Sequence, residues 1–322
     1  MKTFVLAITT VNRRAYLKSC IDSFINTRNR SYNWKIILAD DGSEDGTIEY
    51  IDNLQFVDID IIIIKNYKIG VHQQMNSIFN KLENIVFDFC FKVDDDLTFL
   101  KSGWDDLYYQ NAIKTGFYHL VFCDQTWCSD QLFSKVQKND SLTGMIPLLN
   151  VQGSFYTLTP EILKNVGYMD VSSFGYRGMG HVDYTMRCAR AGYTNSNTPW
   201  DINNSNQYLT TFKLDYKGVF DSIKIDIYDN FYRKEKEDII QTNNRVYIPY
   251  QSIDKELLSK FKDRLIEAYT NKVTVFNKEK YDLSSWYENE IEKTKLWYNN
   301  QYNHLPNWYI QLGKIFKLIR NR

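Results

Sequence analysis

The chain has 322 residues, of which 43% are hydrophobic and 16% aromatic, and its 39 basic and 39 acidic side chains leave no formal net charge. This length allows one large or two moderate domains, and the apolar fraction supports a packed core. Without a global basic field, nucleic acid is excluded as an expected partner. The five cysteines form no Cys-x-x-Cys pair and the four histidines have no zinc spacing, so we expect reduced thiols in a cytoplasmic protein.

Apolar runs alternate with helical periodicity through the first hundred residues. We expect strands over 4–9, 34–39 and 57–65, a fourth strand beginning at 85, and helices over 15–27, 48–54 and 74–84. The continuous run of residues 61–64 predicts a strand covered on both faces. Strand alternating with helix predicts right-handed parallel βαβ units and therefore an α/β fold. The opening apolar run is too short for a signal peptide, and no segment approaches a membrane span.

Two acidic loops follow predicted strands. Asp40 and Asp41 follow the second strand, and Asp94, Asp95 and Asp96 follow the fourth. Adjacent carboxylates repel unless a cation or hydrogen-bond donors compensate them. Mg²⁺ and Mn²⁺ prefer oxygen ligands and often bridge carboxylates to substrate phosphates, and ligands of open α/β sheets bind beyond the carboxyl ends of the strands. Asp94 and Asp96 are therefore candidates for a metal–diphosphate site. The alternatives are a solvated acidic turn for the triplet and an ordinary turn before a helix for the pair.

Six stretches in series give the chain a family resemblance. The first four are 4–14, 37–46, 66–76 and 93–104; Gly153 to Asp170 and Gly180 to Arg187, followed by Ala191-Gly192-Tyr193, complete the series. Together they resemble the successive blocks of the inverting family 2 glycosyltransferases. The resemblance covers about residues 1–200 and implies the GT-A fold, a Rossmann-like mixed sheet flanked by helices.

The resemblance implies roles for residues on the donor side. Thr9 and Val11 match positions that line the nucleotide base, and Asp41 matches a carboxylate that accepts a hydrogen bond from a uracil-type ring nitrogen. A UDP-linked sugar is therefore the expected donor. Asp94 and Asp96 match the Asp-x-Asp motif, in which Asp96 is the favoured direct ligand of Mn²⁺ or Mg²⁺.

Asp95 would hydrogen-bond the ribose or the sugar of the donor. The metal would neutralise the nucleoside diphosphate as it leaves.

The catalytic base is where the sequence departs from the family. The family places an acid six residues before the arginine that matches Arg187, and this chain has His181 there. Asp183 lies two residues later, at a position that is usually acidic but supportive. A neutral imidazole is suited to accept the acceptor's hydroxyl proton near pH 7, and a carboxylate also serves. A third interpretation makes His181 a metal ligand. A purely structural interpretation makes His181 a helix cap and Asp183 an acid in the first turn of the helix.

Three aromatic or turn features are less specific. Trp104 is expected to be a packing residue. Trp127 would either stack on an acceptor sugar or anchor the sheet edge as a buried side chain. Thr159-Pro160-Glu161 predicts a helix start, with threonine as the N-cap and proline in the first turn.

The composition changes near residue 200. We expect a GT-A domain over 1–205, with a nucleotide-binding half over about 1–100 and an acceptor half over about 101–205, and a mostly helical region over 206–322. We expect the tail of this region, 308–322, to form a basic amphipathic helix. This pattern predicts either a peripheral contact with the inner face of a membrane or a helix packed on the enzyme or on a second copy in a homo-oligomer.

The sequence therefore predicts a metal-dependent inverting glycosyltransferase that uses a nucleotide-sugar donor and a saccharide or lipid-linked saccharide acceptor, as in surface polysaccharide assembly. The rival prediction is a catalytically inactive nucleotide-binding or regulatory protein on the same fold, favoured by the missing acid at His181. A nucleotidyltransferase is less favoured, because residues 9–14 lack the glycines of its usual phosphate loop.

Overall fold

The structure is a computed structural model that describes residues 1–122, 124, 145–147, 153–175, 177–194, 200–202, 204–211 and 233–252, together with 256, 259 and 263. The elements of the first half are β1 (Thr3–Thr10), α1 (Arg14–Thr27), β2 (Asn33–Asp40), α2 (Thr47–Asp52), β3 (Ile59–Lys65), α3 (Val71–Leu82), β4 (Phe89–Asp94), β5 (Leu97–Phe99) and α4 (Trp104–Thr115). Those of the second half are β6 (Met145–Pro147), β7 (Phe155–Leu158), α6 (Pro160–Val166), α7 (Val171–Phe174), α8 (Gly180–Arg190), β8 (Trp200–Ile202), η2 (Ser205–Gln207), β9 (Leu209–Thr211) and α10 (Arg233–Thr242).

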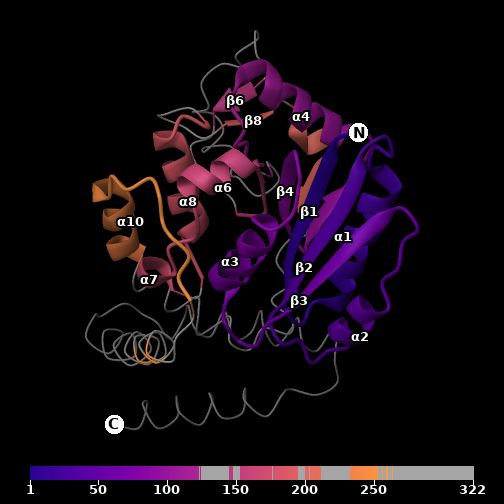
Figure 1. Cartoon of the computed structure of the whole chain (residues 1–322), viewed down its shortest axis with the longest axis horizontal. Coiled ribbons are helices and arrows are strands. Elements are labelled where there is room, and N and C mark those ends of the chain that lie inside the picture. Colours follow the sequence, from indigo (N-terminus) through magenta and orange to yellow (C-terminus); the bar gives the residue numbers. More distant parts are fainter. Residues whose placement is uncertain are drawn as a thin grey trace, which may run out of the picture. The chain divides into compact units, whose positions relative to one another are not determined.

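The main sheet has the order β3-β2-β1-β4-β7 (Figure 1). β1, β2, β3 and β4 pair in parallel, and β7 pairs antiparallel to β4. The predicted alternation of strand and helix is confirmed, and the sheet is mixed as the resemblance implied. Because β1 is central, Thr9 lies opposite Asp94 in the register with β4 and opposite Ala39 in the register with β2. The carboxyl ends of these three strands therefore meet at one edge.

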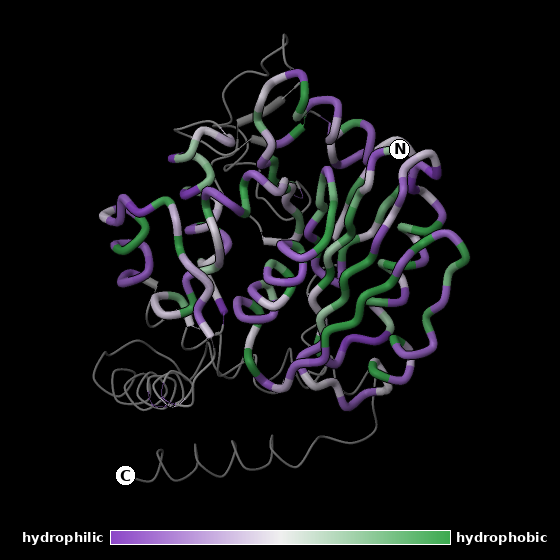
Figure 2. The backbone as a smooth tube through the Cα atoms, in the orientation of Figure 1, coloured by the Kyte–Doolittle hydropathy of each residue, from purple (hydrophilic) through white to green (hydrophobic). Residues whose placement is uncertain are grey.

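Each face of the sheet carries its own core. Successive side chains of a strand point to opposite faces, so Phe4, Leu6 and Ile8 of β1 enter one core while Val5 and Ala7 enter the other. The apolar character of the strands is visible along the sheet in Figure 2.

Trp104 is fully buried in the first core, 4.8 Å from Phe91 between ring centroids. Its predicted packing role is confirmed.

The structure bears out one strand prediction in part and corrects another. The run 61–64 packs on both faces, Ile63 against the first core and Ile62 and Ile64 against the second, but its residues are only half-buried because β3 is an edge strand. The fourth strand begins at Phe89, since the backbone N–H of Ile85 still donates to Leu82 O in the turn that ends α3. This shift makes Asp94 the last residue of β4.

The second half of the chain builds on β7. The N-cap of α6 is Thr159, whose side chain accepts a hydrogen bond from Ile162 N, with Pro160 in the first turn as predicted. The boundary predicted near residue 205 falls at η2, and β9, which follows η2, pairs with β5. All of the described residues belong to one compact unit within Met1–Tyr269.

Two expectations concern residues outside the described ranges, the tail 308–322 and Trp127. Within the described ranges, no helix combines the length and the apolar composition needed to cross a bilayer.

Candidate active site

The loops that follow β1 and β2 are joined by hydrogen bonds. The backbone N–H of Asn12 donates to Ser43 Oγ at 2.8 Å, and the Asn12 side chain accepts from Glu44 N at 2.6 Å. Asn12 has a φ of 52°, a left-handed conformation that asparagine tolerates better than most residues. In the second loop, the carboxylate of Asp40 accepts hydrogen bonds from the backbone N–H groups of Gly42 and Ser43, which makes Asp40 a turn residue. The two loops therefore form one wall at the carboxyl edge of the sheet.

Asp41 joins this wall to the loop after β3. Its two carboxylate oxygens accept hydrogen bonds from Ile69 N at 2.8 Å and from Gly70 N at 2.9 Å. Burial raises the pKa of Asp41, while the two backbone hydrogen bonds act to lower it. Thr9 is also buried, and Val11 is partly exposed at the end of β1. The three residues predicted for the nucleotide base thus lie on neighbouring strand ends.

The carboxylate triplet is held by Arg13. The guanidinium Nη1 lies 2.8 Å from Asp95 Oδ1 and Nη2 lies 2.8 Å from Asp96 Oδ2. Asp95 also accepts a hydrogen bond from Thr10 Oγ1 at 2.7 Å. The side chain of Asp94 is 33% exposed, against 3% for Asp95 and 9% for Asp96. Asp94 is therefore the carboxylate that solvent reaches most easily.

The electrostatics of the triplet reflect both burial and mutual repulsion. Burial raises the pKa of Asp95 to about 7, with Arg13 acting in the opposite direction and Asp96 adding to the rise. Burial and the neighbouring Asp94 carboxylate raise the pKa of Asp96. Burial alone would lower the pKa of Arg13, but Asp95 and Asp96 outweigh it and the pKa is raised. The cluster therefore favours an added positive charge.

A buried lysine connects the triplet to β7. Lys92 lies on β4, its ammonium forms an ion pair with Asp94, and it also donates to Gly153 O at 2.6 Å. The backbone N–H of Asp94 donates to Ser154 O at 2.8 Å. Sequence reasoning missed the roles of Lys92 and Arg13. Lys92 could have been recognised as a lysine inside an otherwise apolar strand, two residues before the first acid of the triplet.

His181 lies on the other side of Gly153. A Cβ atom on Gly153 would lie 3.0 Å from His181 Cγ, so the imidazole packs directly against this glycine. Because Gly153 O accepts from Lys92 and Lys92 pairs with Asp94, a short chain of contacts links His181 to the carboxylate triplet. The structure therefore brings together His181 and Asp94, which are 87 residues apart in sequence.

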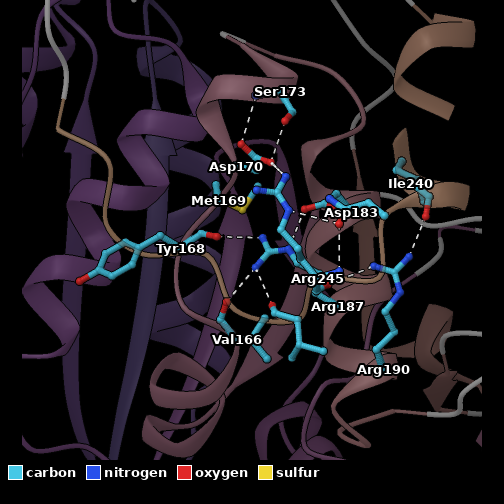
Figure 3. Close-up of polar contacts among 12 residues, drawn as sticks. Val166, Tyr168, Met169, Asp170, Ser173, Asp183, Arg187, Arg190, Ile240 and Arg245 are labelled. Atoms are coloured by element: carbon cyan, nitrogen blue, oxygen red, sulfur yellow. Dashed lines mark hydrogen bonds and ion pairs between the residues drawn. The ribbon is translucent and has the colours of Figure 1, made fainter. Parts of the chain in front are cut away.

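Asp183 lies in a different environment (Figure 3). Its side chain is 1% exposed, and its Oδ2 accepts a hydrogen bond from Arg187 Nε at 2.7 Å within α8. The same guanidinium donates to Val166 O and to Tyr168 O at 2.8 Å each. Burial raises the pKa of Asp183, with Arg187 opposing it. Asp183 thus belongs to a buried ion pair that ties α8 to the segment after α6.

A divalent cation fits the donor set at the end of β4. Asp94 and Asp96 offer hard oxygen ligands and lie close enough for Asp94 to raise the pKa of Asp96. In the described part of the chain, no three His, Cys, Asp or Glu side chains converge into a complete metal cage. Mg²⁺ sites commonly use one or two carboxylates and take their other ligands from water and substrate phosphates. The two neighbouring carboxylates of Asp94 and Asp96 are compatible with that type of site.

Comparisons with known proteins agree with this architecture. Residues 5–153 match the family model of Glycosyl transferase family 2. An uncharacterized glycosyltransferase of Acanthamoeba polyphaga mimivirus is 25% identical over 213 residues, which cover 64% of this chain and 77% of that protein.

Among solved structures, the mannosyltransferase PcManGT from Pyrobaculum calidifontis, in complex with GDP-Man and Mn²⁺, has a TM-score of 0.53 at 11% identity and covers 88% of this chain and 82% of its own. S. aureus TarS has a TM-score of 0.47 at 16% identity over 74% of this chain, and the match spans 42% of the TarS chain.

Proposed function

We propose that the chain is an inverting glycosyltransferase on the GT-A fold, which transfers a sugar from a UDP-linked donor to a saccharide or lipid-linked saccharide acceptor. One observation carries the proposal: Asp94 is linked through Lys92 and Gly153 to His181. These contacts support the proposal, because the acidic group proposed for the metal–diphosphate and the proposed proton acceptor are linked through neighbouring residues.

On the donor side, Asp94 and Asp96 would hold Mn²⁺ or Mg²⁺, which supplies charge neutralisation for the departing diphosphate. Thr9, Val11 and Asp41 would line the nucleotide base. Asp41 keeps lone pairs beyond the two used by Ile69 N and Gly70 N, because each carboxylate oxygen accepts more than one hydrogen bond. Asp95 is held by Arg13 and Thr10, and its proposed contact with the donor ribose or sugar would use its remaining acceptor capacity.

On the acceptor side, we assign the base to His181. An inverting transfer forms the bond from the acceptor oxygen to the anomeric carbon as the bond to the diphosphate breaks, and the hydroxyl proton must leave as this happens. His181 would take that proton on its imidazole. Asp183 is a poor alternative because its carboxylate is buried and already paired with Arg187.

The test is a screen of nucleotide sugars for hydrolysis and transfer with and without Mn²⁺, using the full chain and the Asp96→Ala variant. We expect Mn²⁺-dependent turnover of a UDP-sugar by the wild type and none by the variant. Tight UDP binding with no turnover of any donor would instead support the rival, a nucleotide-binding protein without catalysis. Turnover that is equal with Mn²⁺ and with a chelator would remove the metal from the proposal.

A further inference from the structure

A second histidine, His72, lies next to the candidate base. It is on α3, its residue is 3% exposed, and its Nδ1 lies 2.7 Å from Gly175 O. Burial lowers the pKa of His72 to about 3, and Lys236, His181 and Lys92 act in the same direction, so the ring is neutral near pH 7. A carbonyl oxygen only accepts hydrogen bonds, so the proton of the neutral ring is on Nδ1. His72 therefore donates to Gly175 and presents an unprotonated Nε2.

The opposite edge of the same ring lies against Gly180, the first residue of α8. A Cβ atom on Gly180 would lie 2.5 Å from His72 Nε2, 2.7 Å from Cε1 and 2.8 Å from Cδ2. The φ of Gly180 is outside the left-handed range, so alanine would suit its backbone. Glycine is needed here for space alone, because the imidazole fills the position of the missing side chain.

Between these two contacts the backbone turns sharply. Gly178 has a φ of 81°, and Met179 has a φ of 43°, which is uncommon for a residue with a side chain. Such conformations persist where the surrounding structure determines them. Arg177 O accepts a hydrogen bond from the buried Lys236 Nζ at 3.0 Å, which fixes the middle of the turn. His72 fixes both of its ends, at Gly175 and at Gly180.

We propose that His72 is a positioning residue, which clamps Gly175 and Gly180 and thereby sets the imidazole of His181 against Gly153. The inference rests on the proposed function in one respect, namely that His181 takes the acceptor proton. His72 acts through the start of α8, so its loss moves the proton acceptor and leaves the carboxylates that face the donor unchanged. We therefore expect a defect in turnover and not in the binding of UDP.

The test is a double-mutant cycle of His72→Ala and Gly180→Ala, with His72→Asn as the conservative variant. Gly180→Ala forces the ring out of its position, and we expect kcat to fall roughly 10²-fold, as for a small misplacement of a catalytic group. His72→Ala should cost a similar factor. The double variant should be no worse than either single one, because the added methyl group occupies the space that the ring has left. His72→Asn keeps a side-chain N–H for Gly175 O and should recover most of the activity.

Two measurements separate this inference from the proposed function. Calorimetry should give the same affinity for UDP and Mn²⁺ in the wild type and in all four variants, and hydrogen exchange of the amides over 177–181 should be faster in His72→Ala and near wild type in His72→Asn. If the wild type transfers no sugar, the proposed function fails and the exchange rates alone decide whether the clamp exists. If the wild type transfers sugar and Gly180→Ala does so equally well, the clamp is wrong and the proposed function stands. Losses in the two single variants that multiply in the double variant would also overturn it.

Discussion

Arg187 Nε donates a hydrogen bond to Asp183 Oδ2 at 2.7 Å, and the two side chains are 0% and 1% exposed. They are four residues apart on α8, so the pair lies along one face of the helix. Arg187 also donates to three carbonyl groups outside α8, those of Val166, Tyr168 and Val246 (Figure 3). Removing one partner of a buried pair leaves a charge without compensation, and this costs far more than losing an exposed pair.

For Asp183→Asn we therefore expect a defect in stability. The free energy of unfolding should fall by about 3 kcal/mol, because the buried Arg187 loses its counter-charge. Urea unfolding followed by circular dichroism measures this fall, and the activity per folded molecule should remain within a few-fold of wild type. A variant as stable as the wild type but without turnover would assign the base to Asp183 and refute our assignment to His181.

His181→Ala should have the opposite profile. We expect turnover to fall by roughly 10²- to 10⁴-fold, the range for loss of a general base. Stability and UDP affinity should change little, since His181 packs on Gly153 and the donor residues lie on other elements. His181→Gln is a matched control that keeps a polar side chain of similar length without its basicity, and it should be nearly as impaired. Wild-type turnover in both variants would contradict the proposed role.

Asp96→Ala should abolish the contribution of Mn²⁺ to donor binding while leaving the fold intact. Calorimetric titration of UDP with and without Mn²⁺ measures this contribution. Asp22→Ala is a suitable control, because Asp22 is exposed on α1 and forms an ion pair with Lys18 at the surface. We expect Mn²⁺ to raise the UDP affinity of the wild type and of Asp22→Ala, but not that of Asp96→Ala. An affinity that Mn²⁺ leaves unchanged in the wild type would refute the metal assignment.

Arg13→Met tests whether the guanidinium and a metal compensate the same carboxylates. Without Arg13, Asp95 and Asp96 repel each other in a buried position, and the free energy of unfolding should fall by about 3 kcal/mol in the absence of divalent ions. A ligand stabilises the state that binds it, so Mn²⁺ should raise the Tm of the variant more than that of the wild type. Arg14→Met, which changes an exposed neighbour, should behave as wild type. An equal Mn²⁺-induced rise in all three proteins would show that Arg13 and the metal act independently.

The fold was predictable where local pattern determines structure. The apolar runs that became β1 and β2 and the Thr159–Pro160 helix start are all encoded within a few residues. The meeting of the strand ends at one edge follows from parallel pairing and was also predictable. The position of β7 in the sheet was not predictable, because its antiparallel pairing with β4 joins segments about sixty residues apart.

The sequence singles out the acids of the candidate site but not the side chains that pair with them. Arg13 is more than eighty residues from Asp95 and Asp96, and no spacing rule joins them. The contacts of His72 with Gly175 and Gly180 also join residues that are far apart in the sequence, so no spacing rule predicts them. The pairing of Asp183 with Arg187 could have been recognised, because acid and base four residues apart on a predicted helix is a local signal.

A last prediction concerns pH. His119 is fully buried, with Nδ1 2.9 Å from Thr157 O and Nε2 2.9 Å from Thr185 Oγ1, and burial lowers its pKa to about 4. Between pH 4 and the ordinary pKa of histidine, about 6.5, the unfolded chain binds a proton at this position and the folded chain does not. Stability therefore falls as the pH decreases through this window, by about 1.4 kcal/mol per pH unit for one such group. Asp95, whose raised pKa makes the folded state bind the extra proton, acts with the opposite sign.

The His119 contribution is isolated by comparing the wild type with His119→Gln, because the Asp95 contribution is common to both proteins and cancels. Urea unfolding at several pH values from 4.5 to 7.5 should give a difference in unfolding free energy between the two proteins that shrinks as the pH falls. The variant loses hydrogen bonds at every pH, but at position 119 it carries no group that takes up a proton on unfolding. A difference that stays constant across this range would mean that His119 binds its proton equally in both states, and that its burial does not govern its titration.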